Sequence, residues 1–221
     1  MTFDLSDYRK IYKKNNLIES DVPSDPLKLF HNWFQEEKNI HKIHKKINEE
    51  TNAMSISTIG KDGVPETRIV LLKMYSQKGF IFYTNYYSLK GRSIQKNPKV
   101  CISFYWPNTE RQIIIQGDII KLSKNESDEY FYKRPKKNQI GCWASKQSVI
   151  IPSKEYLFIQ YQKWTHFFKI HMIKRPFYWG GYIIKPYKME FWQGQPNRLH
   201  DRLIYSNLEK KNKWKLYRLS P

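Results

Sequence analysis

Residues 189–205 read MEFWQGQPNRLHDRLIY, and this stretch decides the fold of the C-terminal part of the chain. Gly194, Pro196 and Asn197 are turn-forming residues that separate an aromatic run at 189–193 from a second run ending at Tyr205. Two such runs joined by a turn cluster predict a β-hairpin.

The second strand of this hairpin carries regularly spaced polar side chains. Arg198, His200 and Arg202 are two residues apart, so an extended strand points all three to one face and the residues between them to the other. The spacing alone is equally typical of a solvated strand face and of a ligand-binding wall, with Trp192 beside it.

The use of arginine favours the ligand-binding interpretation. The chain has 30 Lys and only 9 Arg, yet Arg198 and Arg202 lie within five residues of each other. Arginine presents a rigid planar fork that binds carboxylate or phosphate through two hydrogen bonds, which lysine does not. The stretch therefore predicts an anionic ligand.

Length and composition indicate one globular domain. At 221 residues, 40% of them hydrophobic and 16% aromatic, the chain is long enough to bury roughly 70% of its unfolded surface. The longest apolar runs, at 80–83 and 113–115, are far shorter than the ~18 residues of a membrane span, and residues 1–10 lack the apolar region of a signal peptide. We expect a cytoplasmic protein with no membrane partner.

Cysteines and histidines do not have the spacing of a metal site. Cys101 and Cys142 lack a CxxC motif and are interpreted as reduced thiols. His41 and His44 form an HxxH pair without a third ligand nearby, so surface histidines are the favoured interpretation. We expect neither a disulfide nor a bound metal.

The net charge of +19 and the pI near 9.7 meet the first criterion for a nucleic-acid-binding protein. The lysines are scattered over every segment, and the abundance of Lys, Asn and Ile is typical of compositional bias. A basic RNA-binding module is the alternative from another functional class, but it would cluster basic and aromatic residues on one face. We expect no specific nucleic-acid partner.

Periodicity along the chain predicts a mainly β (β+α) fold. A helix begins at Pro26, with Ser24 or Asp25 as its N-cap. Period-two patterns predict strands at 54–59, 68–75, 80–84, 100–106, 111–122, 177–187 and 214–219, which suggest an antiparallel barrel. Helices are expected at 88–97, 125–133 and 153–168, and a polar loop at 139–148. In the last helix, Tyr156, Trp164 and Phe167 are expected in the core.

Four segments place polar groups where an apolar barrel does not need them. They are 68–73, with Arg68 and Lys73 at its ends; 83–90, which ends in Lys90; Arg111 with Gln112; and Gln147 with Ser148. Strict alternation puts Arg68 and Lys73 on opposite faces, so either a bulge intervenes or they meet different ligand groups. The segment ending in Lys90 has the hydroxyls, backbone N–H groups and lysine of a phosphate site at a helix N-terminus.

These segments, in order and spacing, resemble the pyridoxamine 5'-phosphate oxidase family. The resemblance runs from about residue 8 to the C-terminus. It is carried by Asp25-Pro26, RIVLLK at 68–73, YTN at 83–85, ERQ at 110–112, WASKQS at 143–148, EFWQ at 190–193 and RLHDR at 198–202.

The resemblance implies an FMN-binding split β-barrel with peripheral helices and a helical N-terminal arm, in which residues 1–50 form the arm and 51–221 the barrel. It implies an FMN-dependent oxidase that converts pyridoxamine or pyridoxine 5'-phosphate to pyridoxal 5'-phosphate, with hydride transfer from substrate C4' to flavin N5. O2 would be the electron acceptor and H2O2 the product. The enzyme would be a homodimer with FMN at the subunit interface.

The family's site residues transfer to matching positions of this chain. FMN would be held by Arg68, Ile69, Val70, Leu71, Leu72, Lys73, Tyr83, Thr84, Lys90, Gln112, Gln147, Ser148, Trp192 and Arg202. The substrate phosphate would be bound by Lys73, Tyr130, Arg134 and Asn138. Arg198 and His200 would act on the reacting side, with Leu199 between them, and Arg9 and Tyr12 would cover the substrate.

Two positions depart from the family pattern. Leu89 stands where a second arginine is usual beside the FMN-phosphate lysine, and Arg92, one helical turn later, is hypothesised to replace it. Asn138 stands where serine is typical, and its amide can still donate a hydrogen bond. A non-oxidase flavoprotein on the same fold is a second alternative, disfavoured because Tyr130, Arg134 and the reacting-side residues are present.

Overall fold

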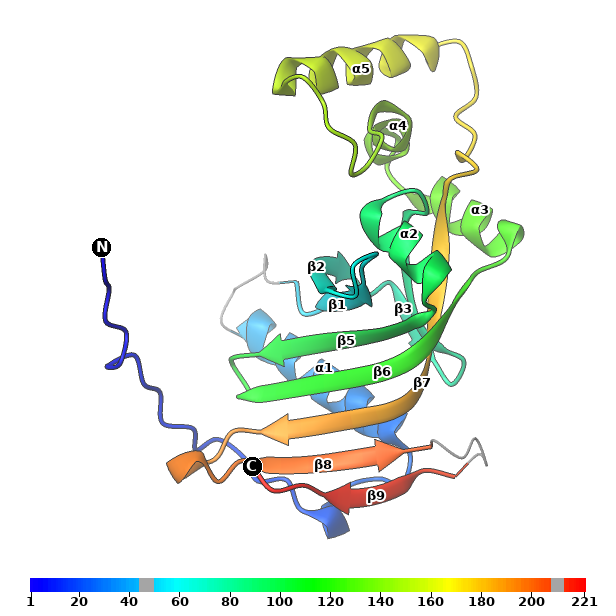
Figure 1. Ribbon diagram of the computed structural model, residues 1–221. Coiled ribbons are helices and arrows are strands. Elements are labelled where there is room, and N and C mark those ends of the chain that lie inside the picture. Colours follow the sequence, from blue (N-terminus) through cyan, green and yellow to red (C-terminus); the bar gives the residue numbers. More distant parts are fainter. Residues whose placement is uncertain (44–49, 208–212) are drawn as a thin grey trace. The chain divides into compact units, whose positions relative to one another are not determined.

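The computed structural model describes residues 1–43, 50–207 and 213–221. Figure 1 shows its elements coloured along the chain. Among the described residues, the helices are α1 (Pro26–Ile43), α2 (Leu89–Lys96), α3 (Lys124–Lys133), α4 (Lys136–Ala144) and α5 (Lys154–Phe167), with short 3-10 turns η1 (Glu19–Asp21) and η2 (Pro196–Arg198). The strands are β1 (Ala53–Ile59), β2 (Pro65–Leu71), β3 (Met74–Ser76), β4 (Gly79–Asn85), β5 (Lys99–Trp106), β6 (Arg111–Lys121), β7 (Trp179–Gln193), β8 (Asp201–Ser206) and β9 (Lys215–Arg218).

The strands form one sheet in the order β2-β1-β5-β6-β7-β4-β3, and β8 pairs with β7 and β9. The long strand β7 has two antiparallel neighbours: residues 179–184 pair with β4 and residues 188–193 pair with β8. The predicted hairpin at 189–205 is therefore confirmed as the β7–β8 pair. The chain divides into two compact units, the first made of residues 1–55, 101–116 and 186–221 and the second of residues 56–100 and 117–185.

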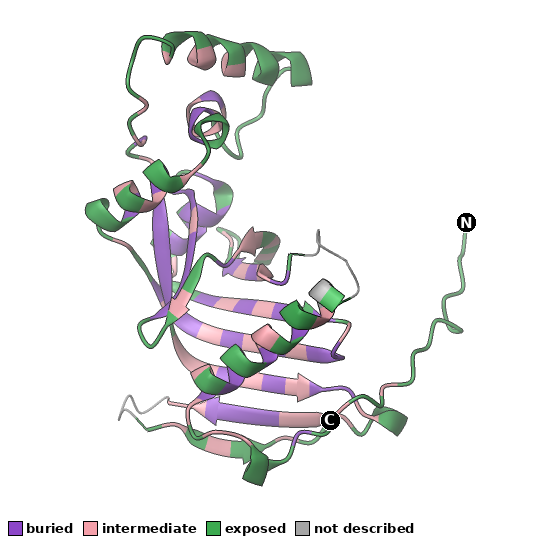
Figure 2. Ribbon diagram, turned by 180° about the vertical axis from the view of Figure 1, so that it is seen from behind, coloured by how far each residue is buried: buried purple, intermediate pink, exposed green. Residues whose placement is uncertain are grey.

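The core of the first unit is aromatic. Phe30 of α1 is fully buried, with ring centroids 5.3 Å from Phe104 and 6.0 Å from Trp106. Trp33, one turn further along α1, lies 5.2 Å from Phe191. Figure 2 shows that α1 has buried residues on one side and exposed residues on the other, as an amphipathic helix requires.

In the second unit, β4 and the first part of β7 are buried almost throughout. Tyr83 lies directly opposite Gly181 in this pair. A Cβ at position 181 would lie 2.5 Å from Leu122 and 2.8 Å from the Tyr83 ring. Glycine at 181 therefore leaves the space that the Tyr83 ring needs.

Many predicted elements are confirmed with small changes of boundary. α1 starts at Pro26, and the Asp25 carboxylate accepts a hydrogen bond from Leu27 N at 2.9 Å, as an N-cap does. Ser88 caps α2, and its hydroxyl accepts from Gly91 N. Residues 1–18 contain no helix or strand, so the helical part of the N-terminal region begins at η1.

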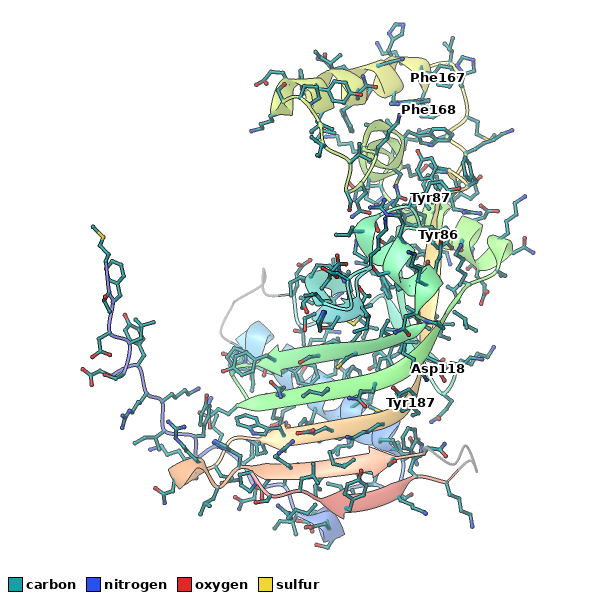
Figure 3. All side chains as sticks on the ribbon, viewed as in Figure 1. Tyr86, Tyr87, Asp118, Phe167, Phe168 and Tyr187 are labelled. Carbon is teal, nitrogen blue, oxygen red and sulfur yellow. The ribbon has the colours of Figure 1, made fainter. Side chains whose placement is uncertain are left out.

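Three predictions about elements are wrong. The expected loop at 139–148 is helical as far as Ala144. Gln139 is buried, and its side-chain amide donates to carbonyls at the end of α3. The polar sequence around Gly141 still permits a helix. The expected strand at 68–75 is interrupted at residues 72 and 73. No residue of α5 is buried, and Tyr156 and Phe167 are 38% and 44% exposed rather than in the core. Phe167 and Phe168 mark the end of α5 in Figure 3.

Two further observations concern membranes and the histidine pair. Among the described residues, no helix combines the length and the apolar character needed to cross a membrane. Of the HxxH pair, His44 lies outside the described residues.

Replacing Phe30 with alanine should destabilise the first unit. Loss of a fully buried ring costs about 3–5 kcal/mol in the free energy of unfolding, because the transfer free energy and the contacts around the cavity are both lost. Denaturant unfolding of Phe30→Ala measures this change. Phe3→Ala is the control, since Phe3 is 77% exposed and its loss should change stability by no more than about 0.5 kcal/mol. Equal stability of the two variants would contradict this packing.

Candidate active site

A cavity of about 480 Å³ in the second unit gathers half of the residues that the sequence marks for ligand binding. Its walls come from the end of β2, from β4, the start of α2, the end of α3, the α3–α4 junction, the loop after α4 and the start of β7. The lining residues are Ile69, Val70, Leu71, Lys73, Tyr83, Thr84, Lys90, Tyr130, Lys133, Arg134, Pro135, Asn138, Gln147 and Trp179. The interruption after β2 allows Lys73 to line this cavity together with residues 69–71.

Lys90 is the most constrained cation of this cavity. Its side chain is only 7% exposed, and its Nζ has the hydroxyls of Thr84 and Ser88 at 3.4 Å. Burial and the nearby positive charge of Arg68 lower the pKa of Lys90 from 10.5 to about 8. A buried cation next to a second cation is stabilised when an anion binds beside it. This part of the cavity therefore fits a phosphate group.

Arg68 is fixed behind this position and does not itself line the cavity. Its guanidinium donates to Thr58 Oγ1 at 2.7 Å and to the Glu66 carboxylate at 3.0 Å. Ser93, on α2, donates to the same carboxylate at 3.3 Å. These bonds orient Arg68 and hold α2, which carries Lys90, to β2.

The N-terminus of α2 adjoins the same region, because α2 carries Lys90. Leu89 N donates to Ser148 Oγ at 3.1 Å, which brings the 147–148 segment to the start of the helix. Ser148 has a left-handed φ of 66°, a conformation rare for residues with a side chain. Its neighbour Gln147 lines the cavity. Helix N-termini favour anions, since their first N–H groups are unpaired within the helix.

Aromatic rings form one side of the cavity. Tyr83 and Tyr130 stack with centroids 3.7 Å apart, and Trp179 is nearly parallel to both, at 5.6 Å and 6.3 Å. The guanidinium of Arg134 lies over the Trp179 ring at 4.6 Å. Trp179 thus supports two of the residues expected to bind the substrate phosphate, although sequence reasoning assigned it only to a strand. Trp179 follows Phe177 and Tyr178 in the sequence, and no feature of this aromatic run distinguishes Trp179 from a core residue.

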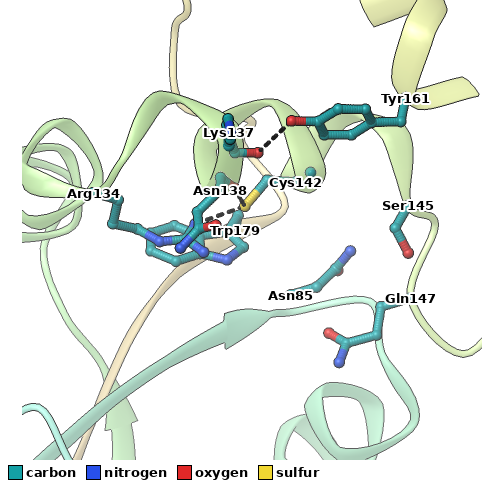
Figure 4. Close-up of a pocket in the computed structure, with 10 residues that line it drawn as sticks. Asn85, Arg134, Lys137, Asn138, Cys142, Ser145, Gln147, Tyr161 and Trp179 are labelled. Atoms are coloured by element: carbon teal, nitrogen blue, oxygen red, sulfur yellow. Dashed lines mark hydrogen bonds between the residues drawn. The ribbon is translucent and has the colours of Figure 1, made fainter. Parts of the chain in front are cut away.

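Arg134 has a second support in Cys142 of α4. Its Nη1 donates to Cys142 Sγ at 2.8 Å, and Cys142 Sγ lies 3.4 Å from the carbonyl of Asn138 (Figure 4). Cys142 and Arg134 line a second cavity of about 520 Å³, together with Lys137 and Tyr161. Arg134, Asn138, Gln147 and Trp179 are shared by the two cavities. From the sequence alone, Cys142 is interpreted only as a reduced thiol.

In the first unit, Tyr12, Trp192 and His200 form an aromatic cluster. The Tyr12 ring meets Trp192 and His200 edge-on, each at 5.6 Å, and Trp192 lies 4.8 Å from His200. Gln195 N donates to His200 Nδ1 at 3.0 Å. Because Nδ1 accepts this bond, the neutral imidazole carries its proton on Nε2, which leaves Nε2 as a donor.

The predicted alternation of Arg198, His200 and Arg202 on one strand face is wrong. β8 begins only at Asp201, and Arg198 belongs to η2, where both Asn197 and Arg198 have left-handed φ angles of 56° and 63°. The segment before β8 that is not a strand thus extends three residues beyond Asn197, to His200. Leu199, which follows the turn, is 69% exposed.

Of the remaining predicted residues, Arg202 and Arg9 have local partners. Arg202 lies opposite Trp192 in the β7–β8 pair and binds the Glu190 carboxylate at 2.8 Å. Arg9 is exposed and donates to Ser6 O at 3.0 Å. Leu72 is buried, and Gln112 is the second residue of β6.

Two arginines have structural partners and line neither of the two cavities described above. Arg111, the first residue of β6, is buried between Trp33, Gln193 and Glu36. Arg92 donates to Tyr87 O at 2.6 Å. Arg92 is not among the lining residues of either cavity, so its hypothesised role toward FMN stays a prediction.

Comparison with known proteins relates most of the chain to one family. Residues 40–168 match the family model described as pyridoxamine 5'-phosphate oxidase. Residues 179–221 match the model described as pyridoxine 5'-phosphate oxidase C-terminal dimerisation region.

Individual relatives are similar over their full length. The pyridoxine/pyridoxamine 5'-phosphate oxidase of Christiangramia forsetii is 48% identical over 221 residues, which is 100% of both chains. That of Flavobacterium johnsoniae is 48% identical over 217 residues, 98% of this chain and 99% of the relative.

Solved structures confirm the predicted split-barrel fold. PhzG from Burkholderia lata, in complex with tetrahydrophenazine-1-carboxylic acid, has a TM-score of 0.81 at 28% identity, covering 94% of this chain and 98% of that chain. A pyridoxamine 5'-phosphate oxidase-related, FMN-binding protein of Nostoc punctiforme has a TM-score of 0.62 at 16% identity, covering 83% and 96%.

The lowered pKa of Lys90 should appear in the pH dependence of stability. Between about pH 8 and about pH 10.5 the unfolded chain keeps the Lys90 proton that the folded protein has lost, so the free energy of unfolding rises with pH in this window. Denaturant unfolding of the ligand-free protein at several pH values, compared with Lys90→Met, isolates this contribution. The variant should lack that part of the rise.

Inorganic phosphate provides the control for the same measurement. An anion beside Lys90 raises the pKa of the ammonium group, so saturating phosphate should reduce the difference in pH dependence between the native protein and Lys90→Met. Identical pH dependence of the two proteins without phosphate would contradict the burial of an uncompensated Lys90.

Proposed function

Since the chain belongs to the pyridoxamine 5'-phosphate oxidase family, we propose that it oxidises pyridoxamine or pyridoxine 5'-phosphate to pyridoxal 5'-phosphate, using FMN and O2 and releasing H2O2. The observation that carries the proposal is the cavity of the second unit. Its buried Lys90, the N-terminus of α2 and the supported Arg134 provide cationic and N–H groups for two phosphate-bearing ligands.

The residues present fit FMN. The buried cation Lys90, with Arg68 behind it and Thr84 and Ser88 beside it, suits the FMN phosphate. Residues 69–71, Lys73 and Gln147 of the cavity wall would contact the remainder of the cofactor, together with the buried Leu72. Tyr83, also in the wall, and Ser148, bound to Leu89 N at the start of α2, would add hydroxyls. When bound, FMN would supply the redox chemistry by accepting the hydride of substrate C4' at N5 and returning the electrons to O2.

The substrate phosphate would be bound by Lys73, Tyr130, Arg134 and Asn138, all of which line the same cavity. Each charge-assisted hydrogen bond to a phosphate contributes about 1.5–3 kcal/mol. Arg134 is held in place by Trp179 and Cys142, so little side-chain entropy is lost when it binds.

Arg198 and His200 would be the residues of the reacting side. Arg198 would orient the substrate and stabilise negative charge, and His200 would donate a hydrogen bond from Nε2, since its Nδ1 is bound to Gln195 N. Leu199 would contact the substrate, Arg9 and Tyr12 would cover it, and Gln112, Trp192 and Arg202 would contact FMN. Orientation of the substrate and exclusion of water are the main requirements, because the cofactor carries the redox step.

A homodimer is supported by the match of residues 179–221 to a C-terminal dimerisation region. FMN would lie at the interface of the two subunits. We also propose a cytoplasmic location, which is consistent with the two free thiols.

Replacing Arg134 should weaken substrate binding and leave FMN in place. Loss of one charge-assisted contact corresponds to a rise in KM for pyridoxine 5'-phosphate of about 10- to 100-fold. H2O2 production by Arg134→Leu and the FMN content of the purified variant measure the two effects. Lys96→Leu is the matched control for KM, because Lys96 is exposed and lines neither cavity. An unchanged KM in Arg134→Leu would exclude the proposed phosphate contact.

A further inference from the structure

Glu110 is a buried carboxylate that the proposed chemistry does not use. It lies between β5 and β6, immediately before Arg111, and is 2% exposed. Its φ of 59° is left-handed, a conformation that costs energy in a residue with a side chain. A buried charge in a strained conformation persists only when its surroundings stabilise it.

The groups that stabilise this carboxylate come from the N-terminal arm, here residues 10–14. Oε2 accepts hydrogen bonds from Lys13 N at 2.9 Å and Lys14 N at 3.2 Å, and Oε1 forms an ion pair with Lys10 Nζ at 3.0 Å. Burial raises the pKa of Glu110, but these donors outweigh that effect, so the net pKa is lowered and the group is ionised at neutral pH. Hydrogen bonds from backbone N–H groups to a carboxylate are among the stronger ones in proteins.

The backbone of Glu110 binds Gly194, on which the Tyr12 ring packs. Gly194 N donates to Glu110 O at 2.9 Å, which fixes the segment after β7 to Glu110. A Cβ at position 194 would lie 2.6 Å from Tyr12 Cδ1, so the ring rests directly on the glycine backbone. From this seat the ring meets both Trp192 and His200 edge-on.

Asn15 and Leu17, which follow the arm, are also bound to the first unit. Leu17 N donates to Asp201 Oδ2 at 3.1 Å, and Gln195 Nε2 donates to Asn15 O at 2.6 Å. Asp201 directly follows His200, and Gln195 lies five residues before it. The arm is therefore held on both sides of Tyr12 by polar groups of the first unit.

We propose that Glu110 is a positioning residue, whose buried carboxylate docks residues 10–14 so that the Tyr12 ring is seated on Gly194 against Trp192 and His200. The carboxylate acts through the arm and has no contact with a reacting atom. Its effect on catalysis rests on the proposed function, whereas its effect on the arm does not. Docking by the chain's own groups means that the arm is ordered before the substrate binds.

Limited trypsin digestion of the full-length protein tests the docking directly. Arg9, Lys10, Lys13 and Lys14 are cleavage sites within the arm, and cleavage of a docked segment follows the fraction of time it is open. Glu110→Gln removes the ion pair and one strong acceptor, so cleavage at these sites, followed by mass spectrometry, should be at least about tenfold faster. Glu155→Gln is the matched control, because Glu155 is exposed on α5 and its replacement should leave the rate unchanged.

Gly194→Ala provides a second variant that keeps the buried carboxylate. The added methyl group would lie 2.6 Å from Tyr12 Cδ1 and displace the ring, whereas the backbone conformation at 194 suits alanine. Arm cleavage should therefore again accelerate. This variant decides the question if Glu110→Gln does not fold, as judged by loss of a cooperative thermal transition. Arm cleavage at the native rate in the folded variants would overturn the proposal.

Steady-state kinetics then tests the catalytic consequence. With the arm released, KM for pyridoxine 5'-phosphate should rise several-fold while FMN content stays constant, and an unchanged KM alongside fast arm cleavage would overturn the positioning role. If the native protein shows no oxidase activity, the proposed function fails, but the digestion rates still decide whether Glu110 docks the arm.

Discussion

The buried ammonium group of Lys90 is the constraint on which the cavity depends. It has hydroxyl neighbours, and Arg68 adds a second positive charge nearby. Removing a charge from water without a counter-charge is unfavourable, so the ligand-free protein is destabilised at this position. A phosphate dianion relieves that cost, and part of its binding free energy comes from this relief. The hydrogen bonds of Arg68 to Thr58 and Glu66 keep the second cation in place when no ligand is present.

Backbone strain is concentrated in the segments assigned to function. Among the described residues, the non-glycine residues with left-handed φ angles are Glu110, Ser148, Asn197 and Arg198. Ser148 meets the N-terminus of α2, Asn197 and Arg198 form the turn before His200, and Glu110 holds the N-terminal arm. Each such conformation costs on the order of 1–3 kcal/mol and persists where the surroundings fix it. The strain accordingly falls in polar loops, where it sets side-chain directions, and the strands that support them remain regular.

Much of the cavity was predictable from the sequence, because short polar motifs on apolar strands report a burial cost that only a ligand offsets. Residues 69–71, Lys73, Tyr83, Thr84 and Lys90 line one cavity for this reason. Local conformation was harder to predict. The turn includes Arg198 because this residue adopts a left-handed φ angle as Asn197 does, and sequence propensity anticipates that angle for asparagine but not for arginine. α4 was missed because its glycine and polar residues resemble a loop, and its stability comes from contacts of Gln139 with the end of α3. Trp179 was not distinguishable from a core aromatic residue, since its role arises from the stacking of Arg134 and Tyr130 upon it.

The visible absorption spectrum of the purified protein, before and after anaerobic addition of pyridoxine 5'-phosphate, tests the central claim most directly. The account predicts flavin bands near ~370 and ~450 nm, with the ~450 nm band bleaching on addition of substrate and returning when O2 is admitted. A yellow protein that does not bleach would contradict the oxidase assignment. A protein that stays colourless and inactive after addition of FMN would contradict the assignment of the cavity to this cofactor.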